Sequence, residues 1–236
     1  MSGPFGSSQW MYLSELPPRF GARGVFAQNS ASPQNRIQYI TIASTGNSTD
    51  FGDAVLKSGQ AESQGGNGCA GGGRGIIFGG GYPAVNVIQY ITIANTGNAS
   101  DFGDMIQANY NGGALSNGAR GVHGGGDGID AAVDIIEYIT IASTGNSQDF
   151  GNLLDVAGAG LAGFCDGSRG CFAGKISDGQ DFGIQYITVA STGNAQDFGD
   201  LSVTRYDIAA VENGTRLSLI HISEPTRRTP SAYAVF

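Results

Sequence analysis

Apolar and β-branched residues alternate with polar ones in a block that occurs four times along the chain. The blocks read IQYITIA, IQYITIA, IEYITIA and IQYITVA, and their tyrosines are Tyr39, Tyr90, Tyr138 and Tyr186, which are 51, 48 and 48 residues apart. In the first block Ile37 and Tyr39 share one face of a strand, and Ile40 and Ile42 share the other. Two apolar faces predict a strand that lies between two packed layers.

A turn and a second strand follow each block. In the first block the turn is Ser44–Asn47, where Gly46 and Asn47 favour a tight reversal. The Asp-Phe-Gly segment that comes next predicts a short strand anchored by its phenylalanine. We expect the tyrosine and phenylalanine of each repeat to be structural positions: Tyr39, Phe51, Tyr90, Phe102, Tyr138, Phe150, Tyr186 and Phe198.

Two more strands are predicted upstream of each tyrosine. An Arg-Gly pair opens an apolar segment at Arg23, Arg74, Arg120 and Arg169, and glycine runs follow two of these segments. Small residues precede each arginine from the second onward, and they indicate a further short strand. Four short antiparallel strands in about 48 residues are typical of a β-propeller blade.

The order of these elements resembles the kelch repeat, in which an apolar strand ending in Gly-Gly precedes a tyrosine and a tryptophan. Here Phe51 and its counterparts stand where that repeat has tryptophan, and Ala27-Gln28 stands where it has the glycine pair. The resemblance implies an all-β, kelch-like propeller of about four blades in an incomplete ring. A β-solenoid fibre is the alternative architecture, and hydrogen bonds joining successive tyrosine strands would favour it.

The sequence YITIASTGN…DFGD also resembles repeats in tail-fibre-like proteins of marine bacteriophages. We expect an N-terminal segment at 1–13, a repeat domain at 14–216 and a tail at 217–236. The tail sequence LSLIHISEPTR is similar to a translated sequencing-library adaptor, and the Gly expected after Arg216 is absent. The natural protein is therefore expected to continue beyond Arg216.

Composition narrows the classes of function. The net charge of −8 disfavours binding to a nucleic-acid backbone. The first residues lack the pattern of a signal peptide, so synthesis in the cytoplasm is expected, followed by assembly at a virion or cell surface. Cys69, Cys165 and Cys171 have no metal-ligand spacing, and Cys69 and Cys165 are expected at matching strand positions.

Motifs that suggest chemistry have structural interpretations here. Asp-Phe-Gly occurs in every repeat without the other kinase motifs. His123 replaces an apolar residue of the sister repeats, so we expect it in the core. The acidic loop with Asp127, Asp130 and Asp134 could hold a calcium ion through its carboxylate oxygens, but it lacks the full calcium-loop spacing, which favours a solvated loop. No cofactor, metal site or catalytic residue is predicted.

The sequence differences between repeats fall in the loops that lead to the tyrosine strands. Because hairpins of an antiparallel meander alternate between the two ends of a sheet, these loops are expected at one end. Rigid scaffolds commonly carry recognition on such loops. The predicted binding residues are Tyr82, Asn86, Asp127, Asp130, Asp134 and Asp178.

We therefore expect a non-enzymatic binding or structural repeat protein, of the kind found in phage appendages. Its expected partners are other virion or surface proteins and host-surface glycans, without membrane insertion, and homo-oligomers are compatible with open blade edges. The alternative class is a propeller enzyme of the galactose-oxidase type. Such an enzyme needs copper held by Tyr, Cys and His, and the chain has only His123 and His221.

Overall fold

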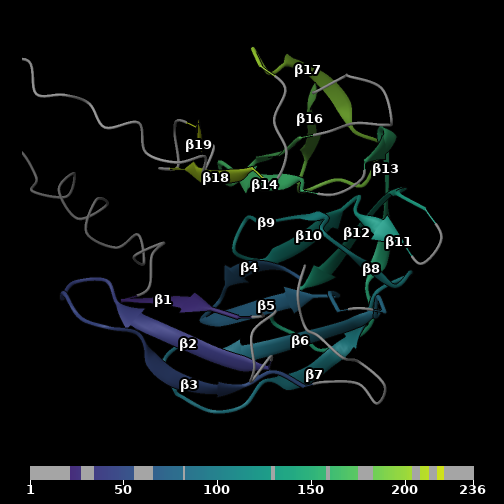
Figure 1. The fold of residues 1–236 in the computed structure, drawn as a ribbon. Helices are drawn as coiled ribbons and strands as arrows, with labels where there is room; N and C mark the ends of the chain where they lie inside the picture. The colour runs from purple at the N-terminus through teal and green to yellow at the C-terminus, as the bar shows by residue number, and fades with distance from the viewer. Residues whose placement is uncertain are drawn as a thin grey trace, which may run out of the picture.

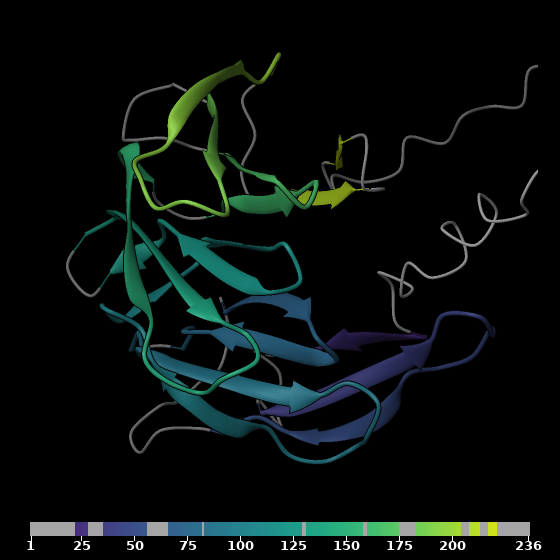
Figure 2. The same ribbon diagram turned by 180° about the vertical axis from the view of Figure 1, so that it is seen from behind.

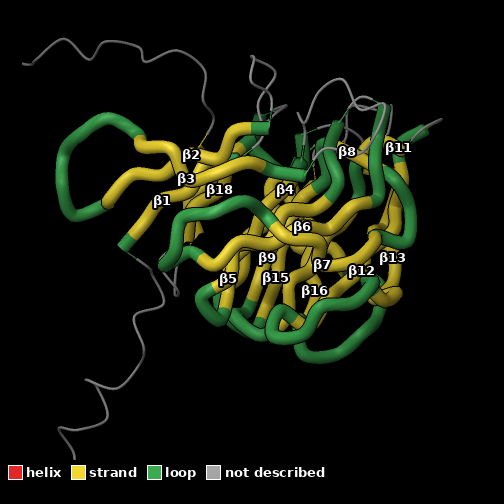
Figure 3. The backbone as a smooth tube through the Cα atoms, turned by 90° about the horizontal axis from the view of Figure 1, so that it is seen from below, coloured by secondary structure: helices red, strands yellow, loops and turns green. Residues whose placement is uncertain are grey.

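A computed structural model describes residues 22–27, 35–55, 66–81, 83–128, 131–157, 160–174, 183–203, 208–212 and 217–220. The described residues form strands and loops without a helix (Figure 3). No helix among them is long and apolar enough to cross a membrane. The all-β class predicted from the alternating pattern is confirmed.

Three of the repeats form four-stranded antiparallel sheets. In each sheet the strands lie side by side in the order in which they occur along the chain. The second repeat contains β4 (Asn67–Gly71), β5 (Arg74–Phe78), β6 (Val87–Thr92) and β7 (Ser100–Asp104). The third contains β9 (Gly113–Ser116), β10 (Arg120–Gly124), β12 (Val133–Thr140) and β13 (Gln148–Ala157). The fourth contains β14 (Ala162–Cys165), β15 (Arg169–Ala173), β16 (Gly183–Thr188) and β17 (Gln196–Asp200).

The first repeat and the end of the described chain form smaller sheets. The first repeat contains β1 (Arg23–Phe26), β2 (Arg36–Thr41) and β3 (Thr49–Asp53), in that order. After the fourth repeat, β18 (Ala209–Glu212) pairs with β19 (Leu217–Ile220). A two-stranded sheet, β8 (Asn109–Tyr110) with β11 (Asp127–Gly128), was not predicted.

The tyrosine strand of each repeat pairs only inside its own sheet. Tyr90, for example, lies opposite Ile76 of β5 and Ser100 of β7. The continuous ladder of tyrosine strands that would indicate a solenoid is therefore absent from the described sheets.

The sheets follow one another as an arc in the order of the sequence, from purple β1–β3 to the yellow-green β16 and β17 (Figure 1). Neighbouring sheets meet through their first strands: β4 lies beside β9, β9 beside β14, and β14 beside β18. The arc is open between β18 and β1, to the left in Figure 1 and to the right in Figure 2. The sheets do not close into a ring.

The hydrophobic core lies between the sheets. One cluster joins the first two repeats through Ile37 and Ile77, the next joins the second and third through Phe102 and Ile141, and a third joins Phe150 of the third repeat to the fourth. The tyrosine strands of the second and third repeats are thus covered on both faces, as the sequence pattern predicted, whereas Ile42 of the first repeat is exposed.

Burial of the repeated phenylalanines differs at the end of the arc: Phe51, Phe102 and Phe150 are buried, whereas Phe198 is half exposed. The expectation that the two cysteines occupy matching strand positions is wrong. Cys69 lies opposite Ile76, whereas Cys165 lies opposite Gly170, so the two cysteines occupy different strand positions. The cause is their spacing from the arginine: Cys69 lies five residues before Arg74 and Cys165 four residues before Arg169, while both hairpins turn over two residues.

Candidate binding face

The strand registers divide the loops of each sheet between two ends, as predicted. At one end β5 begins opposite the end of β6, where Arg74 pairs with Thr92 and the Thr-Gly-Asn turn follows. We call this the turn end. At the other end Val87 pairs with Asp104, so the loop before β6 and the segment after β7 lie together. We call this the variable-loop end.

Three of the predicted binding residues are described, and they lie at the variable-loop end. Asn86 directly precedes β6, and its carbonyl accepts a hydrogen bond from the Met105 N–H at 2.6 Å. Asp127 lies in β11, and Asp134 lies near the start of β12. The structure thus places the two aspartates in the third repeat and Asn86 in the second. Tyr82, Asp130 and Asp178 lie outside the described residues.

The unpredicted pair β8 and β11 ties this end of the molecule together. The Gly80 N–H of the second repeat donates to the Asn109 carbonyl at 3.0 Å, and the Gly160 N–H of the fourth donates to the Asn111 carbonyl at 3.0 Å. Asn111 has a φ of 60°. The Asn111-Gly112 pair is a turn signal that could have indicated this reversal in the sequence.

A row of exposed aliphatic residues also lies at the variable-loop end, and the sequence analysis missed it. Val55, Ile106 and Leu154 occupy the same position in three repeats, two residues beyond the Asp-Phe-Gly-Asp/Asn segment. Each backbone N–H donates to the side chain of the next sheet: to Gln89, Glu137 and Gln185, at 2.6, 2.8 and 2.7 Å. The backbone of each exposed residue is therefore fixed. Its recurrence at one position in the repeat was the available signal.

A buried polar pair lies beneath this end in the third repeat. His123 is fully buried, as expected for a core position, and its Nδ1 lies 3.4 Å from Oε1 of the buried Glu137. The other oxygen of Glu137 accepts hydrogen bonds from the Ile106 N–H and from Ser147 Oγ, at 2.8 and 2.6 Å. The sister repeats have Gln89 and Gln185 in place of Glu137. The third repeat has thus changed two facing residues together.

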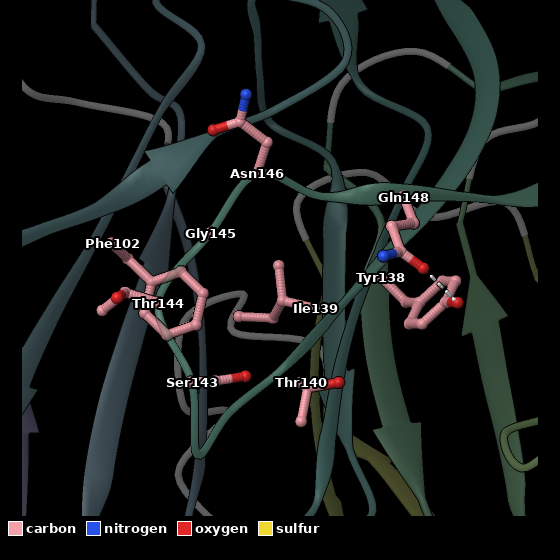
Figure 4. A pocket seen from close by; sticks show the side chains of 9 residues that line it. All are labelled: Phe102, Tyr138, Ile139, Thr140, Ser143, Thr144, Gly145, Asn146 and Gln148. Atoms are coloured by element: carbon pink, nitrogen blue, oxygen red, sulfur yellow. Dashed lines mark hydrogen bonds between the residues drawn. The ribbon is translucent and has the colours of Figure 1, made fainter.

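A small cleft lies at the turn end, between the second and third repeats (Figure 4). Its volume is about 130 Å³. Hydroxyl and amide side chains dominate its lining, and the Tyr138 hydroxyl donates to Gln148 at 2.6 Å. The lining residues are Phe102, Tyr138, Ile139, Thr140, Ser143, Thr144, Gly145, Asn146 and Gln148. The cleft lies in the part of the repeat whose sequence hardly varies, away from the predicted binding residues.

Titratable residues of the described chain are dispersed. No three His, Cys, Asp or Glu side chains in the described ranges are arranged to hold a metal ion. Burial raises the pKa of the Cys171 thiol to about 11, while the Arg169 guanidinium lowers it. A thiol with so high a pKa is a poor nucleophile at neutral pH, because the thiolate is the reactive form.

The variable-loop end therefore combines loops of differing sequence, carboxylates and exposed aliphatic residues whose backbone is hydrogen-bonded to the next sheet. The comparisons with known proteins do not identify this arrangement: no protein-family model and no curated protein matches the chain.

Proposed function

We propose that the protein is a non-enzymatic binding scaffold of kelch-like β-propeller blades, and that its variable-loop end recognises glycans. The observation that carries this proposal is the separation of the two ends. The turn end repeats nearly the same residues four times, whereas the loop end differs from repeat to repeat. Proteins that bind ligands through loops usually keep the framework constant and vary the loops at one end of it.

The arrangement of the sheets supports the propeller. Their first strands gather where neighbouring sheets meet, as the inner strands of propeller blades do. Small residues allow this close approach: a Cβ placed on Gly163 would strike the backbone of Ala114 in the next sheet. Both the open arc and the three-stranded first sheet fit a ring that is incomplete in the described residues.

The surface chemistry supports a glycan as the ligand. Sugars present both C–H faces and hydroxyl groups, so their sites combine apolar contacts with a few oriented polar groups. The variable-loop end carries both the exposed aliphatic residues Val55, Ile106 and Leu154 and the carboxylates of Asp127 and Asp134. The resemblance of the repeats to phage tail-fibre-like proteins supports a place on a virion appendage, in contact with other virion proteins and with the host surface.

A glycan array followed by titration calorimetry tests the proposal. Tyr82→Ala and Asp134→Ala, both at variable-loop positions, are expected to weaken binding at least tenfold. Thr45→Ala and Thr96→Ala are matched controls on exposed threonines of the turn end, and they should leave binding unchanged. The two control variants should melt within about 2 °C of the parent protein, because substitutions of exposed residues usually change stability by less than about 0.5 kcal/mol. A loss of binding in a loop-end variant counts for the proposal when that variant melts in the same range.

Two results would contradict the proposal. One is a parent protein that binds no glycan on the array. The other is equal loss of binding in the turn-end and loop-end variants.

A further inference from the structure

Each junction between neighbouring sheets is built from the same two faces. The trailing face of one sheet presents the phenylalanine of Asp-Phe-Gly and the arginine that opens the second strand. The leading face of the next sheet presents one residue of the arginine strand, which is Ile77, His123 or Phe172, and an apolar residue just after the tyrosine strand. At the third junction Phe150 of the trailing face is buried with Phe172 and Val189 of the leading face.

The same hydrogen bonds recur at all three junctions. At the third, the Gly193 N–H donates to the Phe150 carbonyl at 2.7 Å, and Arg120 Nη1 donates to the Val189 carbonyl at 3.0 Å. In addition, the Asn152 N–H donates to Asn194 Oδ1 at 3.1 Å. The equivalent bonds join Phe51, Arg23 and Asp53 to the second sheet, and Phe102, Arg74 and Asp104 to the third.

The two ends of the arc leave one face of each kind uncovered. On the leading face of the first sheet, Phe26 is 57% exposed and Ile42 is 62% exposed. Their counterparts in the fourth sheet, Phe172 and Val189, are buried. On the trailing face of the fourth sheet, Phe198 is 50% exposed. The outer faces are thus the two halves of a fourth junction.

The strands at the two ends are complementary as well. In the complete sheets the arginine strand pairs with a first strand, as β15 pairs with β14. In the first sheet the described residues provide β1 with only one neighbour, β2. At the other end β18 lies beside β14 in the place of a first strand, and it pairs only with β19. Together, β18 and β1–β3 amount to one complete sheet.

We propose that two copies of this chain associate head to tail through these faces. The β1–β3 sheet of one copy packs on the trailing face of the fourth sheet of the other, and its β1 pairs with β18 in the place of β19. The backbone of Gly46 then bonds the Phe198 carbonyl, and Arg169 bonds the Ile42 carbonyl. A two-stranded sheet such as β18–β19 has little stability of its own, so replacing β19 by β1 costs little and completes a four-stranded sheet.

A second copy of the chain is the partner, because the leading face of the first sheet and the trailing face of the fourth match in residue type and in strand register. Each contact required at the new junction is already made three times within the molecule. Head-to-tail faces are different surfaces, so a substitution on either one should block association. The inference does not depend on which ligand the variable-loop end binds.

Sedimentation velocity of the full chain from about 1 to 200 μM, with two complementary variants, tests this association. Ile42→Glu places a charge on the leading face and Phe198→Glu places one on the trailing face. The parent protein should form dimers or larger species as its concentration rises, and each variant alone should stay monomeric. A mixture of the two variants should form a one-to-one dimer and nothing larger, since one intact junction remains. Leu154→Glu, an equally exposed aliphatic position outside these faces, should associate like the parent.

A parent protein that stays monomeric throughout this range would overturn the proposal. So would variants that associate like the parent, or a mixture of monomeric variants that fails to form the dimer. Circular dichroism should show the same β content in every variant, because all three substituted side chains are already exposed.

Discussion

Arg120 holds two sheets together at the scale of a single residue. Its guanidinium lies 4.6 Å from the centre of the Tyr138 ring in its own sheet, and its Nη1 reaches the Val189 carbonyl in the next. Stacking on the ring orients the planar group and leaves its N–H edge free to donate. The same stacking occurs at Arg23, Arg74 and Arg169. The recurring Arg-Gly pair is therefore a connector between sheets.

His123 and Glu137 are the residues on which the third repeat differs most from its sisters inside the core. We expect His123→Phe alone to destabilise the protein by about 1–3 kcal/mol, because it leaves one oxygen of buried Glu137 without its facing partner. The double variant with Glu137→Gln restores the sister-repeat pairing and should recover most of the loss. Urea unfolding of the parent, both single variants and the double variant measures the coupling. Strictly additive effects would show that the two side chains do not interact.

The strands and their order could be predicted because their signals are local. In the second repeat, alternation around Tyr90 predicts one strand, Phe102 anchors the next, and Gly97 marks the turn between them. The structure confirms both strands and the turn. The arginine strands and the separation of the two loop ends followed from the same local pattern.

The contacts between sheets could not be predicted in this way. The partner of Arg120 and the row formed by Val55, Ile106 and Leu154 depend on which faces meet in space. The exposure of Phe198 shows the same limit, since its sequence surroundings match those of buried Phe150. At the candidate site, sequence reasoning located the end of the sheets at which Asn86, Asp127 and Asp134 lie, but it did not indicate the aliphatic row at the same end.

The last strand of each sheet is the element that meets the next repeat. Gly151 in β13 has a φ of 144°, and a Cβ added there would lie 2.5 Å from the Gly193 carbonyl oxygen of the following sheet. Gly199 occupies the equivalent place in β17 with a φ of 132°, but no atom lies within 4 Å of its Cβ position. The two glycines share a backbone conformation and differ in their neighbours.

This difference isolates how much the close approach between sheets contributes to the free energy of unfolding. Gly199→Ala should cost about 1–2 kcal/mol, from the unfavourable φ alone. Gly151→Ala should cost at least about 1 kcal/mol more, because the added methyl group also pushes two backbones apart. Thermal unfolding of the two variants at an equal, low concentration, at which the chain is monomeric, provides the comparison. Equal losses would mean that the junction is loose enough to accept a methyl group.

At the scale of the molecule, stability should vary along the arc. The second and third sheets have a neighbour on each side, whereas the first sheet has one, and the outer half of the fourth is uncovered. Contacts in such repeat arrays are mostly between neighbours, so the end units open more readily than the inner ones.

Hydrogen exchange at low protein concentration should reveal this gradient. The amides of Gly145 and Gly193 bond carbonyls of the preceding sheet, and Gly46 has no preceding sheet in the described chain. We expect Gly46 to exchange at least about 100-fold faster than either, which corresponds to a difference of about 2.7 kcal/mol in opening free energy. Uniform protection across the three turns would indicate a single cooperative unit.

The repeated junction has a consequence for how this gene can change. Each sheet offers the following sheet the same backbone carbonyls and the same phenylalanine ring. A tandem segment gained or lost by unequal recombination therefore leaves every remaining interface intact. The number of repeats can therefore change by whole units during evolution. Point mutations in the loops meanwhile change the residues that each repeat exposes at the variable-loop end.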